Sequence, residues 1–140
     1  MKRIFIDSDV ILDVLAQRQP FYFASAQIMS LCENKQLEGF TTPFVFANVY
    51  YLLNKLRSRE IAETSLRKLR LILDVLTLNG DHVDRALNST FSDFEDALKN
   101  YSAEACGIEI IITRNVSDYK HSKLMVHTPL SFLKLHKKNS

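Results

Sequence analysis

The sequence has little that could hold a small fold together by covalent or metal cross-links. It contains no tryptophan and only two cysteines, Cys32 and Cys106, which lie far apart and form no Cys-x-x-Cys pair. Its four histidines have no spacing typical of a zinc site. With three glycines and three prolines, the chain also lacks the composition of a linker or a fibrous protein. We therefore expect neither a disulfide scaffold nor a structural zinc site.

Long apolar runs and a strong excess of one charge are missing as well. The longest largely apolar stretches, such as residues 108–112, are much shorter than the roughly 20 residues that span a bilayer. Residues 1–3 lead directly into a strand pattern and Asp7 instead of a signal-peptide core. We therefore expect a cytoplasmic protein without a membrane partner. The net charge of +2 excludes a simple polycationic nucleic-acid binder, so any RNA contact would depend on local patches.

The chain does contain enough apolar material for one hydrophobic core. Its 140 residues have the length of a single domain, and 46% of them are hydrophobic. We expect one domain over residues 1–136, followed by a frayed C-terminal tail at residues 137–140.

Strand and helix patterns alternate along the chain, which favours a parallel sheet covered by helices on both faces. The strand candidates are residues 3–6, 37–41, 75–78, 108–112 and 124–127. The helix candidates are residues 10–15, 21–34, 44–56, 62–73, 81–88 and 93–106, with a final helix from residue 129. Asp81 and Asp93 are expected to be N-caps, and Gly107 is expected to end the helix before it. The fold class is therefore α/β.

Three aspartates are expected at one edge of this sheet. Asp7 follows the first strand, Asp118 follows the strand at 108–112, and Asp96 lies near the start of the helix at 93–106. In open α/β sheets the functional crevice lies beyond the carboxyl ends of the strands. Converging carboxylates repel one another unless a cation joins them, and such hard oxygen ligands suit Mg²⁺ or Mn²⁺. Metal-assisted hydrolysis of phosphodiesters is the reaction that this pattern favours.

Residues 5–13, 93–98 and 112–119 (FIDSDVILD, DFEDAL and ITRNVSDY) resemble, in order and spacing, the three acidic motifs of PIN domains. The resemblance covers essentially the whole chain. It implies a three-layer α/β/α fold with a mostly parallel sheet of about four to five strands. It also implies a Mg²⁺- or Mn²⁺-dependent endoribonuclease whose catalytic and metal-binding positions match Asp7, Asp96 and Asp118. A VapC-type toxin, a small antitoxin partner and a homodimer are further implications of the resemblance.

The sequence departs from the usual PIN pattern at two positions. Asn48 occupies the position, in the stretch FVFANVYYL, where PIN nucleases of this type commonly carry a glutamate. An amide oxygen can still act as a ligand or accept a hydrogen bond, but it brings no negative charge, so metal affinity and activity should fall. Asp9 replaces the more common Asn or Ser of the first motif. As a hypothesis, it partly restores the missing charge as an additional metal ligand.

Several of these residues have a structural explanation as well. Asp7, Asp9 and Asp118 could each cap a helix or a turn. Asp93 and Asp96 form a capping pair, with Asp93 as N-cap and Asp96 as the third helical residue, yet both remain candidate ligands. The candidate RNA contacts beside the acidic residues are Ser8 in the first motif and Arg114 and Asn115 in the third motif.

Three functions remain open at this point. The first is the metal-dependent endoribonuclease, in which a metal-activated water attacks RNA and Asn48 assists. The second is a catalytically weakened PIN domain that binds RNA or a protein. The third is a phosphatase of the haloacid dehalogenase type, because Asp7 and Asp9 also fit an Asp-x-Asp pattern after a strand.

Overall fold

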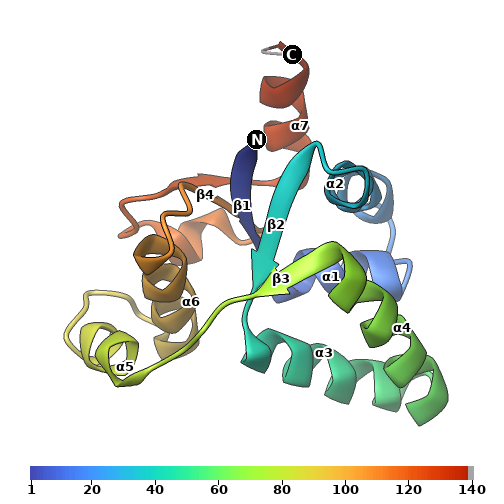
Figure 1. Ribbon diagram of the computed structural model, residues 1–140, viewed down its shortest axis with the longest axis horizontal. Helices are drawn as coiled ribbons and strands as arrows, with labels where there is room; N and C mark the ends of the chain where they lie inside the picture. The colour runs from blue at the N-terminus through green and yellow to red at the C-terminus, as the bar shows by residue number, and fades with distance from the viewer. Residues whose placement is uncertain (139–140) are drawn as a thin grey trace.

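The structure, a computed structural model, describes residues 1–138 and is built around a five-stranded sheet (Figure 1). The strand order is β3-β2-β1-β4-β5, and every neighbouring pair is parallel. The strands are β1 (Lys2–Ile6), β2 (Leu37–Thr41), β3 (Leu73–Val75), β4 (Ile110–Ile112) and β5 (Met125–His127). The expected α/β class and number of strands are confirmed.

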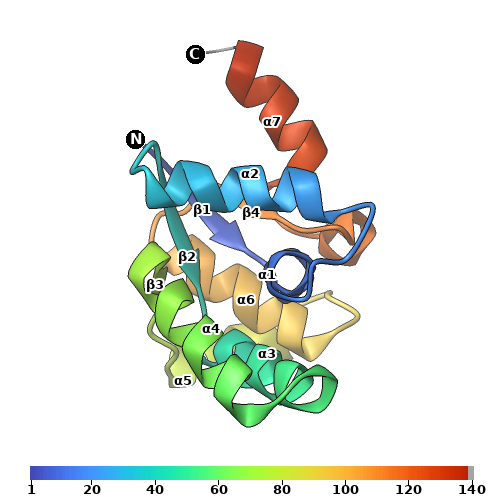
Figure 2. The same cartoon turned by 90° about the vertical axis from the view of Figure 1, so that its right-hand side faces the viewer.

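Helices cover both faces of this sheet. They are α1 (Ser8–Leu15), α2 (Tyr22–Glu33), α3 (Pro43–Leu56), α4 (Arg59–Ile72), α5 (Gly80–Leu87), α6 (Phe94–Ala105) and α7 (Pro129–Lys138), with a short 3₁₀ helix, η1, at Val116–Tyr119. Helices α1, α2 and α4 lie on one side of the sheet and α5 and α6 on the other, while α3 extends beyond the carboxyl ends of the strands (Figures 1 and 2). Among residues 1–138, no helix is both long and apolar enough to cross a membrane.

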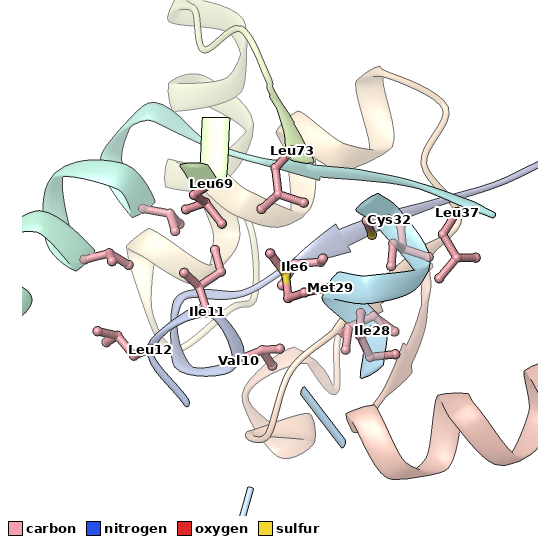
Figure 3. Packing of buried hydrophobic residues seen from close by; sticks show 14 of the residues in the cluster. Ile6, Val10, Ile11, Leu12, Ile28, Met29, Cys32, Leu37, Leu69 and Leu73 are labelled. Carbon is pink, nitrogen blue, oxygen red and sulfur yellow. The ribbon is translucent and has the colours of Figure 1, made fainter. Parts of the chain in front are cut away.

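The alternation of side chains along β1 divides the core into two halves. Ile4 and Ile6 face the larger cluster, which includes Ile28, Leu53 and Leu69 from α2, α3 and α4. Figure 3 shows Ile6, Ile28 and Leu69 in this cluster. Phe5 points the opposite way, into a smaller cluster under α6. Because successive residues of a strand point to opposite faces, one short apolar strand can anchor both halves of the core. Burial of β1 on both faces in turn fixes the position of Asp7, the residue that follows it.

The helix boundaries follow from capping residues that the sequence supplies. Thr42 caps α3 by accepting a hydrogen bond from the Val45 amide, and Pro43 takes the first helical position, where no donor is lost. Asp93 caps α6 as expected. Gly107 follows the end of α6 with a φ of 72°, a left-handed conformation that glycine adopts without strain.

Several expected boundaries were wrong. The third strand is Leu73–Val75 instead of 75–78, because α4 leads directly into a strand whose Leu73 pairs with Gly39. Helix α5 is capped by Asn79, which accepts from the His82 amide, and not by Asp81. The strand expected at 108–112 is regular only from Ile110.

The expected C-terminal tail also differs in part. Residues 137 and 138 belong to α7, because the helix that begins at Pro129 continues beyond the expected boundary at 136. Residues 139–140 of that tail lie outside the described residues.

Candidate active site

Asp7 forms the centre of the site at the carboxyl end of β1. It is 5% exposed, and its two carboxylate oxygens accept four hydrogen bonds. Oδ1 accepts from the Ser8 amide at 2.8 Å and from Lys99 Nζ at 2.9 Å. Oδ2 accepts from Thr113 Oγ1 at 2.9 Å and from the Tyr119 hydroxyl at 3.0 Å. Asp7 therefore caps α1 and also joins β1 to α6 and to the segment after β4.

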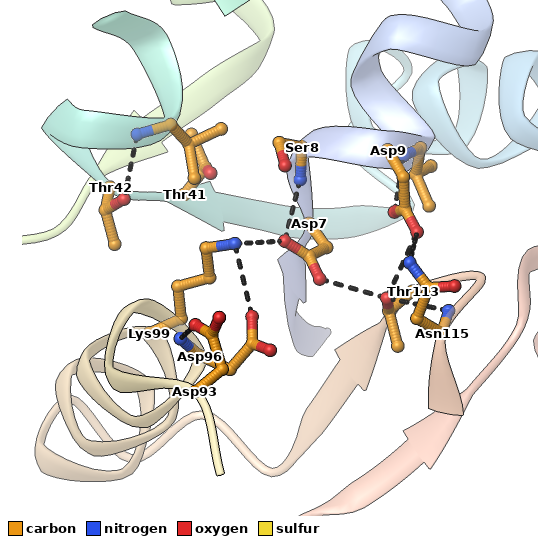
Figure 4. A network of polar contacts seen from close by, with 12 residues as sticks. Asp7, Ser8, Asp9, Thr41, Thr42, Asp93, Asp96, Lys99, Thr113 and Asn115 are labelled. Atoms are coloured by element: carbon orange, nitrogen blue, oxygen red, sulfur yellow. Dashed lines mark hydrogen bonds and ion pairs between the residues drawn. The ribbon is translucent and has the colours of Figure 1, made fainter. Parts of the chain in front are cut away.

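Lys99 connects Asp7 to Asp96 (Figure 4). Its Nζ lies 2.9 Å from Asp7 Oδ1 and 3.5 Å from Asp96 Oδ1, and its side chain is only 8% exposed. Burial lowers the pKa of Lys99, but the Asp7 carboxylate, which accepts its hydrogen bond, and Asp96 together raise that pKa above the ordinary value. The ammonium group is therefore charged at neutral pH.

Asp96 lies in the first turn of α6, where its amide donates to the N-cap Asp93. Its Oδ1 lies 3.4 Å from the Tyr119 hydroxyl, which also contacts Asp7. Burial raises the pKa of Asp96 to about 6, and this effect together with the charges of Asp7, Asp93 and Asp118 outweighs the opposing effect of Lys99. The Asp96 carboxyl group therefore keeps its proton up to a higher pH than an ordinary aspartate does.

Asp9 makes a different set of contacts from those of Asp7. Its Oδ1 accepts from the Val10 amide, and its Oδ2 accepts from the Arg114 amide at 3.0 Å and from Asn115 Nδ2 at 3.2 Å. Thr113 Oγ1 lies 3.4 Å from the same Oδ2. These contacts hold the segment after β4 against α1, which is a structural role; its role as a metal ligand stays a prediction.

Arg114 is held by α1. Its guanidinium contacts both carboxylate oxygens of the fully buried Asp13, at 2.6 and 3.2 Å, and lies 3.9 Å from the ring centre of Phe21. Arg18 pairs with the same aspartate at 2.9 Å. The Arg114 side chain thus fixes the segment after β4 in place, and a contact to RNA would have to come from its remaining exposed edge.

The other candidate residues surround this centre. Asp93 and Asp118 are exposed, yet both influence the pKa of Asp96 and so lie near it. Asn48 is exposed on α3, and within residues 1–138 its side chain makes no hydrogen bond. It follows Phe44 by four residues and therefore shares a helix face with it. The Phe44 ring centre lies 5.8 Å from Lys99 Nζ, so this face of α3 is turned toward the site.

The donor set of the site suits a hard divalent cation. Mg²⁺ commonly binds to one or two carboxylates and completes its coordination with water and substrate phosphate oxygens. Asp7 and Asp96 present their Oδ1 atoms toward one point, the position of Lys99 Nζ. As the side chains lie, no group of three or more His, Cys, Asp or Glu residues within 1–138 is arranged to hold a metal ion. The two carboxylates fit a metal, but only after a rearrangement.

Sequence reasoning missed Lys99, Thr113 and Tyr119, the three side chains that complete the environment of Asp7. Lys99 follows Asp96 by three residues, a spacing that places both on one helix face and could have indicated the pair. Thr113 and Tyr119 lie inside the recognised third motif, but nothing in their spacing indicates a bond to Asp7, which is more than 100 positions away in sequence.

Several known proteins resemble this chain in sequence or in fold. Ribonuclease VapC1 of Aquifex aeolicus is 24% identical over 123 residues, which cover 84% of this chain and 85% of that protein. The structure of Mycobacterium tuberculosis VapC20, a sarcin-ricin loop cleaving toxin, superposes with a TM-score of 0.63 at 16% identity, over 77% of this chain and 86% of that one. A toxin–antitoxin complex from Klebsiella pneumoniae gives a TM-score of 0.66 at 17% identity, over 90% of this chain and 97% of that one. The PIN domain family model matches residues 3–117, and the chain therefore belongs to the PIN domain family.

Proposed function

We propose that this protein is a metal-dependent endoribonuclease of the VapC type. The observation that carries the proposal is the pair formed by the buried Asp7 and the partly buried Asp96 at the carboxyl edge of the parallel sheet, joined by Lys99 and Tyr119. The similarity to a ribonuclease and to an RNA-cleaving toxin supports RNA as the substrate. Membership of the PIN family removes the support for a phosphatase based on Asp7 and Asp9.

In this proposal the chain's own residues prepare the site for the reaction. Asp7 and Asp96 would hold Mg²⁺ or Mn²⁺, with Asp93, Asp118 and Asn48 around them. A bound ion would supply Lewis-acid activation of the phosphate and of a water molecule. Thr113 and Tyr119 hold the Asp7 carboxylate in one orientation, so that the carboxylate itself need not turn during the reaction.

The test is cleavage of a labelled RNA pool by protein purified without any partner. The reactions contain Mn²⁺, Mg²⁺ or a chelator, and compare wild type with Asp96→Asn and with Asp74→Asn, an exposed aspartate on β3. Cleavage should require the metal, fall by roughly 100-fold or more in Asp96→Asn, and stay unchanged in Asp74→Asn. Cleavage that persists in chelator, or in Asp96→Asn, would contradict the proposal.

The Asn48→Glu variant tests the weakened PIN domain as the alternative. A carboxylate at position 48 adds negative charge on the α3 face that is turned toward Lys99, and should strengthen metal binding and cleavage. If only Asn48→Glu cleaves RNA, the natural protein is a PIN domain that lacks efficient catalysis.

We also propose a small antitoxin protein as the partner. One chain of the toxin–antitoxin complex from Klebsiella pneumoniae has the same fold as this protein, and this similarity supports the proposal. Co-expression with the product of a neighbouring small reading frame should yield a stable complex in which RNA cleavage is inhibited. The homodimer stays a prediction, to be measured by sedimentation of the isolated protein.

A further inference from the structure

The acceptor capacity of Asp7 is already filled in the structure. An ionised carboxylate offers about four acceptor sites, and Asp7 receives four donors. A cation can bind to Asp7 only if one of these donors leaves. The donor that leaves Asp7 most easily therefore decides how a cation can bind to this carboxylate.

Three of the four donors have little freedom to move. The Ser8 amide belongs to the helix backbone, Thr113 is fully buried, and Tyr119 is 1% exposed. Lys99 is the fourth, and its amine is carried on a long flexible side chain. Although its side chain is also buried, Lys99 is therefore the donor that can leave Asp7 by side-chain rotation alone, without a change in the backbone.

Lys99 also occupies the space that a shared cation would need. Its Nζ contacts Oδ1 of both Asp7 and Asp96. A Mg²⁺ ion held by these two carboxylates would need the space that the Lys99 ammonium fills. The ammonium and the metal ion therefore cannot be bound between the two carboxylates at the same time.

From this geometry, and on the basis of the proposed function, we propose that Lys99 is a built-in counter-ion that competes with the metal. Its ammonium group keeps Asp7 and Asp96 together while no metal is bound, and it must leave Asp7 before Mg²⁺ or Mn²⁺ can join the two carboxylates. Metal binding to this protein is therefore weaker than the carboxylates alone would allow.

The experiment is calorimetric titration of Mn²⁺ into the full chain without RNA. It compares wild type with Lys99→Met, which removes the charge but keeps the apolar length, and with Lys99→Arg, which keeps the charge. Lys134→Met, an exposed position on α7, controls for the change in net charge. We expect Lys99→Met to bind Mn²⁺ at least about 10-fold more tightly than wild type, because a positive charge leaves the site. Lys99→Arg and Lys134→Met should bind as wild type does.

The possible outcomes separate this inference from the proposed function. Equal Mn²⁺ affinity in wild type and Lys99→Met would overturn the competition but leave a metal-dependent nuclease intact. If no variant binds Mn²⁺ at millimolar concentration, both the inference and the metal dependence of the proposed function are wrong.

A measurement on the wild-type protein covers the case in which Lys99→Met does not fold. The ¹H–¹⁵N NMR signal of the Lys99 ammonium can be assigned by its absence from Lys99→Arg. Addition of Mg²⁺ should shift or remove this signal at the concentration at which calorimetry detects binding. A signal that does not change while Mg²⁺ binds would overturn the proposal.

Discussion

At the scale of single residues, Tyr119 stabilises the site with a hydroxyl whose one proton is shared between the carboxylates of Asp7 and Asp96. The hydroxyl lies 3.0 Å from Asp7 and 3.4 Å from Asp96, and the side chain is buried. We expect Tyr119→Phe to lower the free energy of unfolding by about 1.5 to 3 kcal/mol, the range for a hydrogen bond to a charged group. Urea unfolding at pH 7 measures the change.

Tyr101→Phe is the matched control for this variant. The Tyr101 hydroxyl makes no hydrogen bond within residues 1–138. Its ring lies edge-to-face against Phe91 and has the Arg85 guanidinium over one face. Equal losses of stability in Tyr101→Phe and Tyr119→Phe would show that the bond to Asp7 contributes nothing.

Asp96 gives the residue-scale prediction for pH. Burial, with support from neighbouring acids, raises the pKa of Asp96 from 3.8 to about 6 in the folded protein. The folded state thus takes up a proton at a higher pH than the unfolded state, so stability rises as the pH falls from 7 to 5. In metal-free buffer, wild type should gain about 1 kcal/mol over this interval relative to Asp96→Asn. Parallel stability curves for the two proteins would contradict the raised pKa.

At the scale of elements, the close approach of α2 and β3 to β2 depends on Gly39. A Cβ atom at this position would lie 2.6 Å from Leu73 Cδ2 and 2.8 Å from Cys32 Sγ, both of which are buried. We expect Gly39→Ala to cost about 1 to 3 kcal/mol of stability, because a packed core must shift to admit a methyl group. Thermal or urea unfolding provides the measurement.

Gly80→Ala is the control for this substitution. Position 80 opens α5 and has free space where a Cβ would lie. Alanine should be neutral there, or stabilise the helix by up to about 1 kcal/mol. A similar loss of stability at both glycines would mean that steric contact at Gly39 is not the cause.

The prediction of elements from sequence succeeded where a local signal exists. Asp93 and Gly107 mark the ends of α6 through local chemistry, and both were predicted correctly. Strand β3 was misplaced because Leu73 could equally continue the apolar stripe of α4. Only its pairing with Gly39 in β2 decides that the chain is a strand at this point.

At the scale of the whole molecule, the two free cysteines report on global opening. Cys32 is only 5% exposed, and its burial raises the pKa of its thiol to about 12. Cys106, in contrast, is partly exposed. Because the thiolate is the reactive form, Cys106 should react with Ellman's reagent first and Cys32 only as the protein unfolds. The rate for Cys32 should rise with urea; rapid reaction of both thiols in native buffer would contradict this.

The sequence by itself determined the α/β class, the parallel sheet and the three acidic motifs, because hydrophobic periodicity, capping residues and motif spacing are local properties of a chain. It also placed Asp7 and Asp96 correctly at one edge of the sheet. Only the tertiary structure decided how the charges of the site are balanced. Lys99 and Tyr119 meet Asp7 across 92 and 112 positions of sequence. Such contacts depend on the packing of α6 and η1 against β1, which no local pattern encodes.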